Sequence, residues 1–239
     1  MFAGQTWWII GASEGLGRAL AVLMLAEGAK VVVSARSQGK LEEFAATDPN
    51  LRALAMDVSD ATSVTVGVAA AGPVDGVVYC VGLYDPMSAL EWQPGSAETM
   101  ADGNYIGALR VLSHLMPGFV ARNAGHIVLI GSLAGFRGLP GAIGYGASKA
   151  ALMHLGENLR VDLRGTGLRV QVANPGFIAT RLTAKNSFRM PQLMTPETAA
   201  GHVLRLMRSN RFSSSFPAPF AWLFTLGRYL PLRLFQRLF

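Results

Sequence analysis

Short apolar runs alternate along the chain with longer stretches in which apolar residues recur every three or four positions. Thr6–Ile10 (TWWII) and Lys30–Ser34 (KVVVS) have the length and the aromatic or β-branched content of buried strands. Gly15–Glu27, between them, has the periodicity of a helix. Strands that alternate with helices form βαβ units, so the pattern predicts an α/β fold. We expect a doubly wound parallel sheet of the Rossmann type, covered by helices on both faces.

The same alternation continues to about residue 207. Besides those named, the expected strands are Arg52–Met56, Gly76–Val81, His126–Gly131 and Arg169–Ala173. The other expected helices are Lys40–Ala46, Asp60–Ala70, Met100–Val120, Gly146–Arg164 and Thr195–Met207, the last opening with a helix-starting Thr-Pro-Glu. No internal repeat or flexible linker interrupts them. We therefore predict one dinucleotide-binding catalytic domain, residues 1–217, followed by an apolar, basic tail, residues 218–239.

Composition excludes several classes of protein. Of the 239 residues, 51% are hydrophobic and 15% are charged, which a disordered chain would not show. The single cysteine, Cys80, rules out a disulfide framework and a cysteine-based zinc site. The four histidines are scattered, so no metal site is expected. The N-terminal residues do not resemble a secretory signal, and we expect a cytoplasmic protein.

The positive charge is concentrated in the C-terminal third. Residues 1–159 carry 9 basic and 13 acidic groups, whereas residues 160–239 carry 12 basic and 2 acidic groups. Such asymmetry suggests nucleic acid or an anionic membrane as a partner. No basic run with interleaved aromatic residues is present, so we expect no nucleic-acid binding.

A glycine-rich loop, GASEGLG, joins the first strand to the first helix. Gly11, Gly15 and Gly17 permit a tight turn and a close approach of the backbone to a phosphate. The free N–H groups and the positive dipole end of the helix would bind that anion. Because dinucleotides bind at the first βα turn of doubly wound sheets, the loop predicts such a cofactor.

The loop also matches a different motif. Residues 11–15 fit GxSxG, the nucleophile elbow of α/β-hydrolases, with Ser13 as nucleophile and His154 or His202 as the base. An elbow usually follows several strands, whereas Ser13 follows the first. The hydrolase interpretation is therefore the weaker one.

Residues at the end of the second strand should decide which nicotinamide cofactor is preferred. An acidic residue there would bind the ribose 2′-hydroxyl of NAD. The stretch Ser34–Ser37 (SARS) has no carboxylate. Arg36 can pair with the 2′-phosphate of NADP, and Ser34, Ser37 and Lys40 are expected to assist it. We expect NADP, with NAD as the alternative because Glu14 brings a carboxylate near the phosphates.

Three polar clusters follow expected strands. Tyr145 and Lys149 (YGASK) stand four residues apart, which places them on one face of a helix. A cation near a tyrosine lowers its pKa, so the pair suits proton transfer to or from an alcohol. Ser132 follows the fifth strand and Asn174–Gly176 (NPG) follows the sixth. Open α/β sheets bind ligands at these strand ends.

Together these residues resemble the short-chain dehydrogenase/reductase family, in its common branch of single-domain proteins of about this length. The resemblance runs from Thr6 to about Phe216. It rests on motifs in matching order and spacing, namely the Gly11–Gly17 loop, Asp57-Val58, Asn104 in GNYIG, Ser132, Tyr145, Lys149, Pro175-Gly176 and Thr180.

The resemblance implies a role for each catalytic position. Tyr145 would be the general acid/base, and Lys149 would lower its pKa and hold the nicotinamide ribose. Ser132 would hydrogen-bond the substrate oxygen, and Asn104 would hold a water that relays protons through Lys149.

The resemblance also implies a cofactor site. Asp57 and Val58 would contact adenine, and Thr180 would contact the carboxamide side of the nicotinamide. The full set of expected cofactor-binding residues is Gly11, Ser13, Gly15, Leu16, Gly17, Arg36, Asp57, Val58, Gly82, Tyr145, Lys149, Pro175, Gly176 and Thr180.

Two positions depart from the family pattern. Ile10 stands where the family usually has Thr before the first glycine. After the fourth strand the chain reads Tyr79-Cys80-Val81-Gly82, where the family usually has Asn-Asn-Ala-Gly. The loss of these amides should alter the adenine side of the site and leave the reactive end intact.

The tail has an unusual composition. Residues 218–239 contain Arg228, Arg233 and Arg237 and no acidic residue. The apolar segment Pro219–Leu230 would be about 18 Å long as a helix, too short to span a bilayer, and Pro231 ends it. The tail is expected either to lie as an interfacial helix on anionic lipid, at the inner face of a membrane, or to pack over the substrate cleft or a neighbouring subunit.

We therefore expect an NADP-dependent oxidoreductase that interconverts a carbonyl and a secondary alcohol on a small, lipophilic substrate. A homodimer or homotetramer is expected. The alternative is a non-catalytic cofactor-binding scaffold or membrane-associated interaction protein on the same fold. Intact Tyr145 and Lys149 favour the enzyme.

Overall fold

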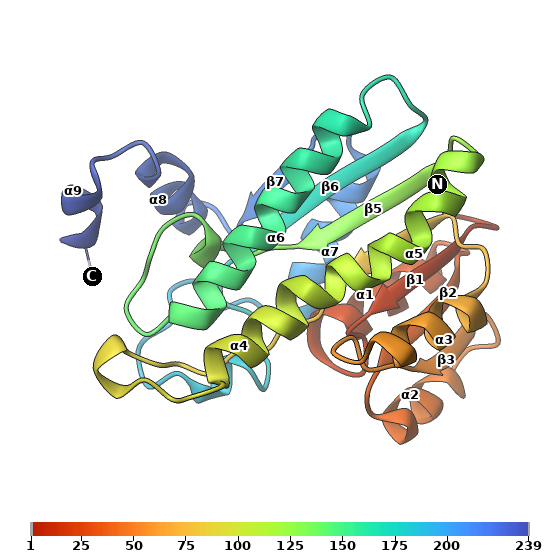
Figure 1. Cartoon of the computed structure of the whole chain (residues 1–239), viewed down its shortest axis with the longest axis horizontal. Helices are drawn as coiled ribbons and strands as arrows, with labels where there is room; N and C mark the ends of the chain where they lie inside the picture. The colour runs from red at the N-terminus through yellow and green to blue at the C-terminus, as the bar shows by residue number, and fades with distance from the viewer. Residues whose placement is uncertain (1, 239) are drawn as a thin grey trace.

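The computed structural model describes residues 2–238. Within these residues, parallel strands form one seven-stranded sheet in the order β3-β2-β1-β4-β5-β6-β7 (Figure 1). The predicted doubly wound fold is confirmed. The strands are β1 (Thr6–Ile10), β2 (Lys30–Ala35), β3 (Leu51–Ala55), β4 (Gly76–Tyr79), β5 (Gly125–Ile130), β6 (Leu168–Pro175) and β7 (Ser213–Phe216).

Helices connect successive strands and cover the sheet. Between α4 and α5 lies a π-helical turn, Asp102–Ile106, and a short 3₁₀ turn, Leu133–Gly135, follows β5. The helices are α1 (Gly15–Ala26), α2 (Gln38–Ala45), α3 (Ala61–Ala71), α4 (Ser96–Ala101), α5 (Gly107–Ala121), α6 (Ile143–Asp162), α7 (Pro196–Arg208), α8 (Phe220–Gly227) and α9 (Leu232–Gln236).

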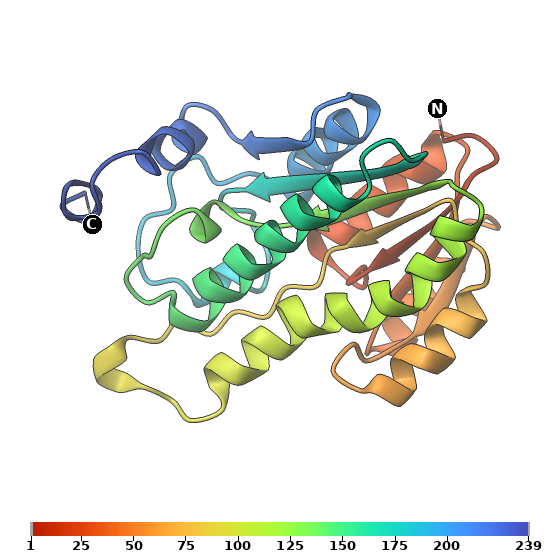
Figure 2. The ribbon, with the colours of Figure 1, turned by 45° about the horizontal axis from the view of Figure 1, so that its top comes forward.

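Two hydrophobic cores lie on opposite faces of the sheet. One contains side chains of α1, α2 and α7, and the other contains side chains of α3, α5 and α6, which lie in front of the sheet in Figure 2. Successive residues of β1 alternate between them. Trp7 and Ile9 belong to the first core, and Trp8 and Ile10 to the second. This alternation explains the unbroken apolar run Trp7–Ile10 in a strand covered on both faces.

Two elements differ from the sequence prediction. The single helix expected over Met100–Val120 is broken by the π-helical turn. Strand β7, Ser213–Phe216, was not predicted, because its three serines lack the apolar signal of a buried strand. It lies at the edge of the sheet and pairs only with β6 among the described strands, so its backbone can form the ladder with polar side chains outward.

The start of α6 matters for the site. The helix begins at Ile143, three residues earlier than predicted, so Tyr145 lies in its first turn. Lys149 follows one turn later and is buried. The carboxyl ends of strands β4, β5 and β6 face this part of α6. The site described below lies at those strand ends.

Candidate active site

A cleft of about 1030 Å³ lies at the carboxyl ends of the strands. It extends from the glycine loop and the end of β2, past the loop after β4, to the first turns of α6. All residues expected to bind the cofactor line it: Gly11, Ser13, Gly15, Leu16, Gly17, Arg36, Asp57, Val58, Gly82, Tyr145, Lys149, Pro175, Gly176 and Thr180. The size and elongated lining suit a dinucleotide.

The glycine loop is shaped as the sequence predicts. Gly11 has a φ of +90°, and a Cβ there would lie 2.8 Å from the backbone of Cys80. A Cβ on Gly17 would lie 2.2 Å from the carbonyl oxygen of Gly11. Helix α1 has no side-chain cap, so its first N–H groups remain available at the cleft. These features fit a cofactor phosphate lying against the loop.

The far end of the cleft carries Arg36 and Asp57. Arg36 is exposed just after β2, and burial of Asp57 is outweighed by hydrogen bonds from Ser59 and by the Arg36 and Arg110 charges, so the Asp57 pKa is lowered. Ser34 is not available to assist Arg36. It is buried, and its Oγ accepts a hydrogen bond of 2.8 Å from Trp8 Nε1. The suggestion that Ser34 assists phosphate binding was therefore wrong.

The unusual residues after β4 keep the sheet joined to the cleft by other means. Tyr79 is buried, and its hydroxyl donates a hydrogen bond to the carbonyl of Gly103 in the π-helical turn. The backbone N–H of Cys80 donates to the carbonyl of Ile10 over 2.8 Å. Backbone hydrogen bonds and the Tyr79 hydroxyl thus hold this segment in place, without the two asparagine side chains that the family usually has here.

Tyr145 and Lys149 both line the cleft. The Lys149 ammonium lies 6.0 Å from the centre of the Tyr145 ring. Its Nζ donates hydrogen bonds to the carbonyls of Ile130, over 2.9 Å, and Val81, over 3.0 Å. Burial lowers the Lys149 pKa to about 8, and the nearby Cys80 raises it.

The electrostatic environment of Tyr145 differs from the expectation. Burial raises the Tyr145 pKa, and a hydrogen bond with the Ser132 side chain lowers it by less. Lys149 is not among the groups that shift the Tyr145 pKa here, and its ammonium donates to two backbone carbonyls. The lowering of the Tyr145 pKa by Lys149 therefore stays a prediction. At neutral pH Tyr145 is therefore a protonated phenol, the form that can donate a proton.

Asn104 has a structural role that sequence did not predict. Its side chain is fully buried in the π-helical turn. Nδ2 donates to the carbonyl of Leu83 and to Ser148 Oγ, both over 2.9 Å, and Oδ1 accepts from the Leu83 N–H over 2.6 Å. These bonds connect the loop after β4 to α6. The water relay stays a prediction.

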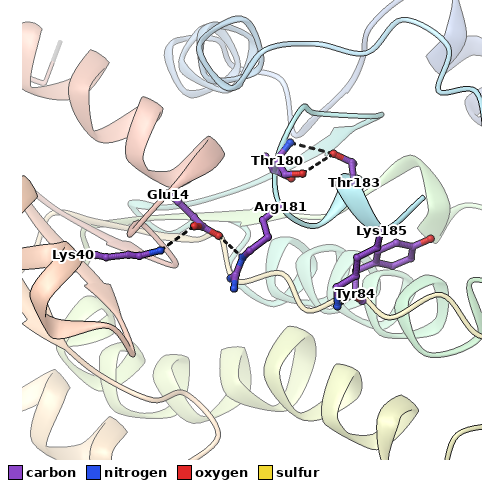
Figure 3. Close-up of polar contacts among 7 residues, drawn as sticks. All are labelled: Glu14, Lys40, Tyr84, Thr180, Arg181, Thr183 and Lys185. Atoms are coloured by element: carbon purple, nitrogen blue, oxygen red, sulfur yellow. Dashed lines mark hydrogen bonds and ion pairs between the residues drawn. The ribbon is translucent and has the colours of Figure 1, made fainter. Parts of the chain in front are cut away.

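A second group of polar contacts crosses the cleft mouth (Figure 3). Glu14, in the glycine loop, accepts a hydrogen bond of 2.8 Å from Arg181 Nε and forms an ion pair of 3.5 Å with Lys40. Arg181 follows Thr180, whose Cγ2 would lie 3.0 Å from a Cβ on Gly15. The loop after β6 thus reaches over the glycine loop.

The same loop also contacts the chain after β4. Lys185 Nζ donates to the carbonyl of Tyr84 over 2.8 Å and pairs with Asp85. The Tyr84 hydroxyl donates to Asn186 Oδ1 over 2.8 Å. The Tyr84 ring packs edge-on against Tyr145 at 5.1 Å between centroids. Sequence reasoning missed Tyr84, because no motif marks it.

The hydrolase alternative lacks its base. Neither candidate histidine lines the cleft with Ser13. His154 is exposed on α6 and pairs with Glu157, and His202 stacks on Phe216. Ser13 therefore has no histidine partner among the described residues.

Comparison with known proteins identifies the family. A family model described as short chain dehydrogenase matches residues 5–190. The chain belongs to the short-chain dehydrogenase/reductase family of oxidoreductases. An uncharacterized oxidoreductase of Myxococcus xanthus (strain DK1622) is 37% identical over 97% of this chain and 95% of its own length.

Solved structures of this oxidoreductase family share the fold. A short chain dehydrogenase/reductase family protein is 30% identical, with a TM-score of 0.83 over 90% of this chain and 96% of its own. The closed form of a serine dehydrogenase complexed with NADP⁺ is 27% identical, with a TM-score of 0.81 over 88% of this chain and 94% of its own. The predicted family resemblance is confirmed.

Proposed function

We propose that this short-chain dehydrogenase/reductase interconverts a carbonyl and a secondary alcohol, with NADP(H) as cofactor and a lipophilic substrate. The observation that carries the proposal is that Tyr145 and Lys149 line the cleft together, with the buried Ser132 side chain hydrogen-bonded to Tyr145. A protonated phenol and a buried ammonium thus border the cofactor-sized space, and a serine hydroxyl lies within hydrogen-bonding reach of the phenol.

The protein's part in this reaction is proton transfer. The nicotinamide ring of the bound cofactor supplies or accepts the hydride. Ser132 and Tyr145 hold the substrate oxygen by hydrogen bonds, and in reduction the Tyr145 phenol gives its proton to that oxygen as negative charge develops there. The raised Tyr145 pKa keeps the phenol protonated near neutral pH, the form that reduction needs as its proton donor.

The charge of Lys149 should make activity depend on pH. Its pKa of about 8 means that the ammonium loses its proton as the pH rises through that value. The Lys149 cation stabilises the phenolate that Tyr145 becomes when it gives up its proton, so loss of the cation slows proton release. We expect the reductive kcat/KM to fall above about pH 8, in a profile measured from pH 6 to 10.

The control for this pH dependence is Lys149→Arg, since guanidinium stays protonated throughout that range. Whatever activity this variant retains should show no fall near pH 8. A wild-type profile that stays flat to pH 10 would contradict the role given to Lys149.

Several features support NADP(H) as cofactor. The residues after β2 include Arg36 and no carboxylate, and Arg36 lines the cleft. Glu14, the carboxylate nearest the glycine loop's phosphate position, is paired with two cations, Lys40 and Arg181. The related serine dehydrogenase was solved with NADP⁺. Together these favour the 2′-phosphorylated cofactor, NADP(H), over NAD(H).

Glu14 should weaken that binding. Its carboxylate occupies Lys40 and Arg181 and adds negative charge where phosphates are expected to lie. Glu14→Gln should tighten NADPH binding roughly fivefold, the effect of one unit charge across ~4 Å in water. Fluorescence titration of NADPH measures this change. The control is Glu42→Gln on α2, outside the cleft, which should leave affinity unchanged. Equal or weaker NADPH binding by Glu14→Gln contradicts the interpretation.

A row of aromatic rings supports a lipophilic substrate. Phe177, after β6, packs on Phe188 at 5.8 Å and stacks on Phe220 at 5.7 Å. Phe220 in turn packs edge-on against Phe224 at 5.2 Å. These rings join the loop after β6 to α8, and we infer that they form an apolar wall for the substrate.

A panel of ketones tests the proposed activity. Purified protein is supplied with NADPH or NADH and with ketones of increasing chain length, and cofactor absorbance is followed. We expect oxidation of NADPH, with kcat/KM rising as the ketone becomes more apolar. Failure of every ketone to be reduced with either cofactor would favour the non-catalytic scaffold.

A further inference from the structure

The C-terminal helices have an inner side that is packed against the catalytic domain. Phe224 of α8 and Phe235 of α9 are buried with Leu133, which follows Ser132 at the end of β5. A Cβ on Gly227 would lie 2.8 Å from the Phe235 ring, so the two helices are in close contact. Arg137 donates hydrogen bonds to the carbonyls of Arg228 and Leu230. The tail is therefore a docked part of the fold.

The outer side of the same helices is apolar and exposed. Trp222, Leu226 and Tyr229 are 59%, 67% and 73% exposed. Leu232, Leu234 and Leu238 of the α9 segment are about half exposed, at 47%, 49% and 54%. Large exposed hydrophobic residues gathered in one short segment indicate a binding surface.

Charge on this surface has a single sign. Arg228, Arg233 and Arg237 are all exposed, and residues 218–239 contain no acidic residue. The Arg228 guanidinium lies 4.8 Å from the centre of the Tyr229 ring. Exposed leucine and tryptophan beside arginine are typical of segments that lie in the headgroup region of anionic membranes.

The position of the helices suits such contact. Figures 1 and 2 show α8 and α9 at the end of the molecule toward which the strands point, projecting beyond β6 and β7. Among the described residues, no helix is long and apolar enough to cross a membrane. Contact with lipid would therefore be peripheral.

We propose that the outer face of α8 and α9 is a docking surface for anionic phospholipid, with Trp222 and Leu226 entering the headgroup region and the arginines binding phosphates. A second copy of the chain fits this face less well. A symmetric contact would oppose Arg228, Arg233 and Arg237 to one another with no acidic partner from this segment. This proposal does not depend on the proposed reaction.

Vesicle sedimentation tests the docking surface with the full-length protein. The probes are vesicles of phosphatidylglycerol mixed with phosphatidylcholine, and vesicles of phosphatidylcholine alone, at low and high salt. We expect binding to the anionic vesicles that weakens as salt rises. Trp222→Ser/Leu226→Ser and Arg233→Gln/Arg237→Gln should each reduce the bound fraction about tenfold or more.

Matched controls alter equally exposed residues elsewhere. Val66→Ser on α3, 63% exposed, and Arg164→Gln/Arg211→Gln should bind vesicles like the wild type. All surface variants should keep the wild-type rate on a water-soluble ketone. Tyr145→Phe should bind vesicles normally. These two results separate the test of lipid docking from the test of the proposed reaction.

Three outcomes would overturn the lipid proposal. These are no binding of the wild type to anionic vesicles at low salt, tail variants that bind as well as the wild type, and binding that salt does not weaken. A change of oligomer size in Trp222→Ser/Leu226→Ser, measured by light scattering, would assign the face to a protein contact instead.

Discussion

Tyr145→Phe should lower kcat for ketone reduction by about 100-fold or more, the usual contribution of a positioned proton donor. The change removes only the hydroxyl, and the remaining ring can still pack against Tyr84. Affinity for NADPH and thermal stability should therefore stay close to wild type. Steady-state kinetics, a cofactor titration and a thermal melt on the same preparation measure these three quantities.

Tyr84→Phe provides the matched control, since it removes the hydroxyl of the neighbouring ring and its bond to Asn186. We expect the kcat of this variant to stay within severalfold of the wild-type value. Any larger effect of the substitution should appear in KM. Near-normal turnover by Tyr145→Phe would contradict the assignment of the proton donor.

Arg36→Asp should reverse the cofactor preference. The substitution replaces a cation that lines the cleft after β2 with a negative charge facing the 2′-phosphate. Loss of a charge-assisted hydrogen bond corresponds to roughly 10- to 100-fold, and added repulsion increases it. We expect kcat/KM for NADPH to fall by about 100-fold and that for NADH to change little.

Lys30→Asp is the control, because Lys30 is exposed at the opposite end of the same strand. It should leave the ratio of NADPH to NADH use unchanged. If the wild type already prefers NADH, the argument from Arg36 fails.

The sequence predicted the fold wherever local pattern determines structure. Apolar runs in β1 and β2 mark buried strands because both faces of the sheet are covered. Strand β7 was not predicted because its serines carry no apolar signal. Its place in the sheet comes from backbone pairing with β6. The π-helical turn was also missed. It is stabilised by hydrogen bonds from Tyr79 at the end of β4 and from Leu83 in the loop that follows, and both residues are distant in sequence.

The site divides in the same way. The four-residue spacing of Tyr145 and Lys149 was sufficient to place both on one face of α6. The bond between Glu14 and Arg181 joins residues 167 positions apart, so no local pattern could reveal it. The raised pKa of Tyr145 likewise depends on its burial in the folded chain, which outweighs the hydrogen bond with Ser132, and on the nearby Tyr84 and Cys80. Such features require the folded arrangement.

Transfer of deuterium from NADPH labelled at the nicotinamide C4 position tests the central claim most directly. The protein is incubated with the labelled cofactor and the ketone that the panel selects, and the alcohol is analysed by mass spectrometry and NMR. We expect one deuterium on the carbinol carbon, from one face of the nicotinamide only, and no labelled product with Tyr145→Phe over the same time. Alcohol that is unlabelled with both the 4R- and the 4S-deuterated NADPH, or equal labelling by Tyr145→Phe, would contradict the proposed hydride transfer assisted by Tyr145.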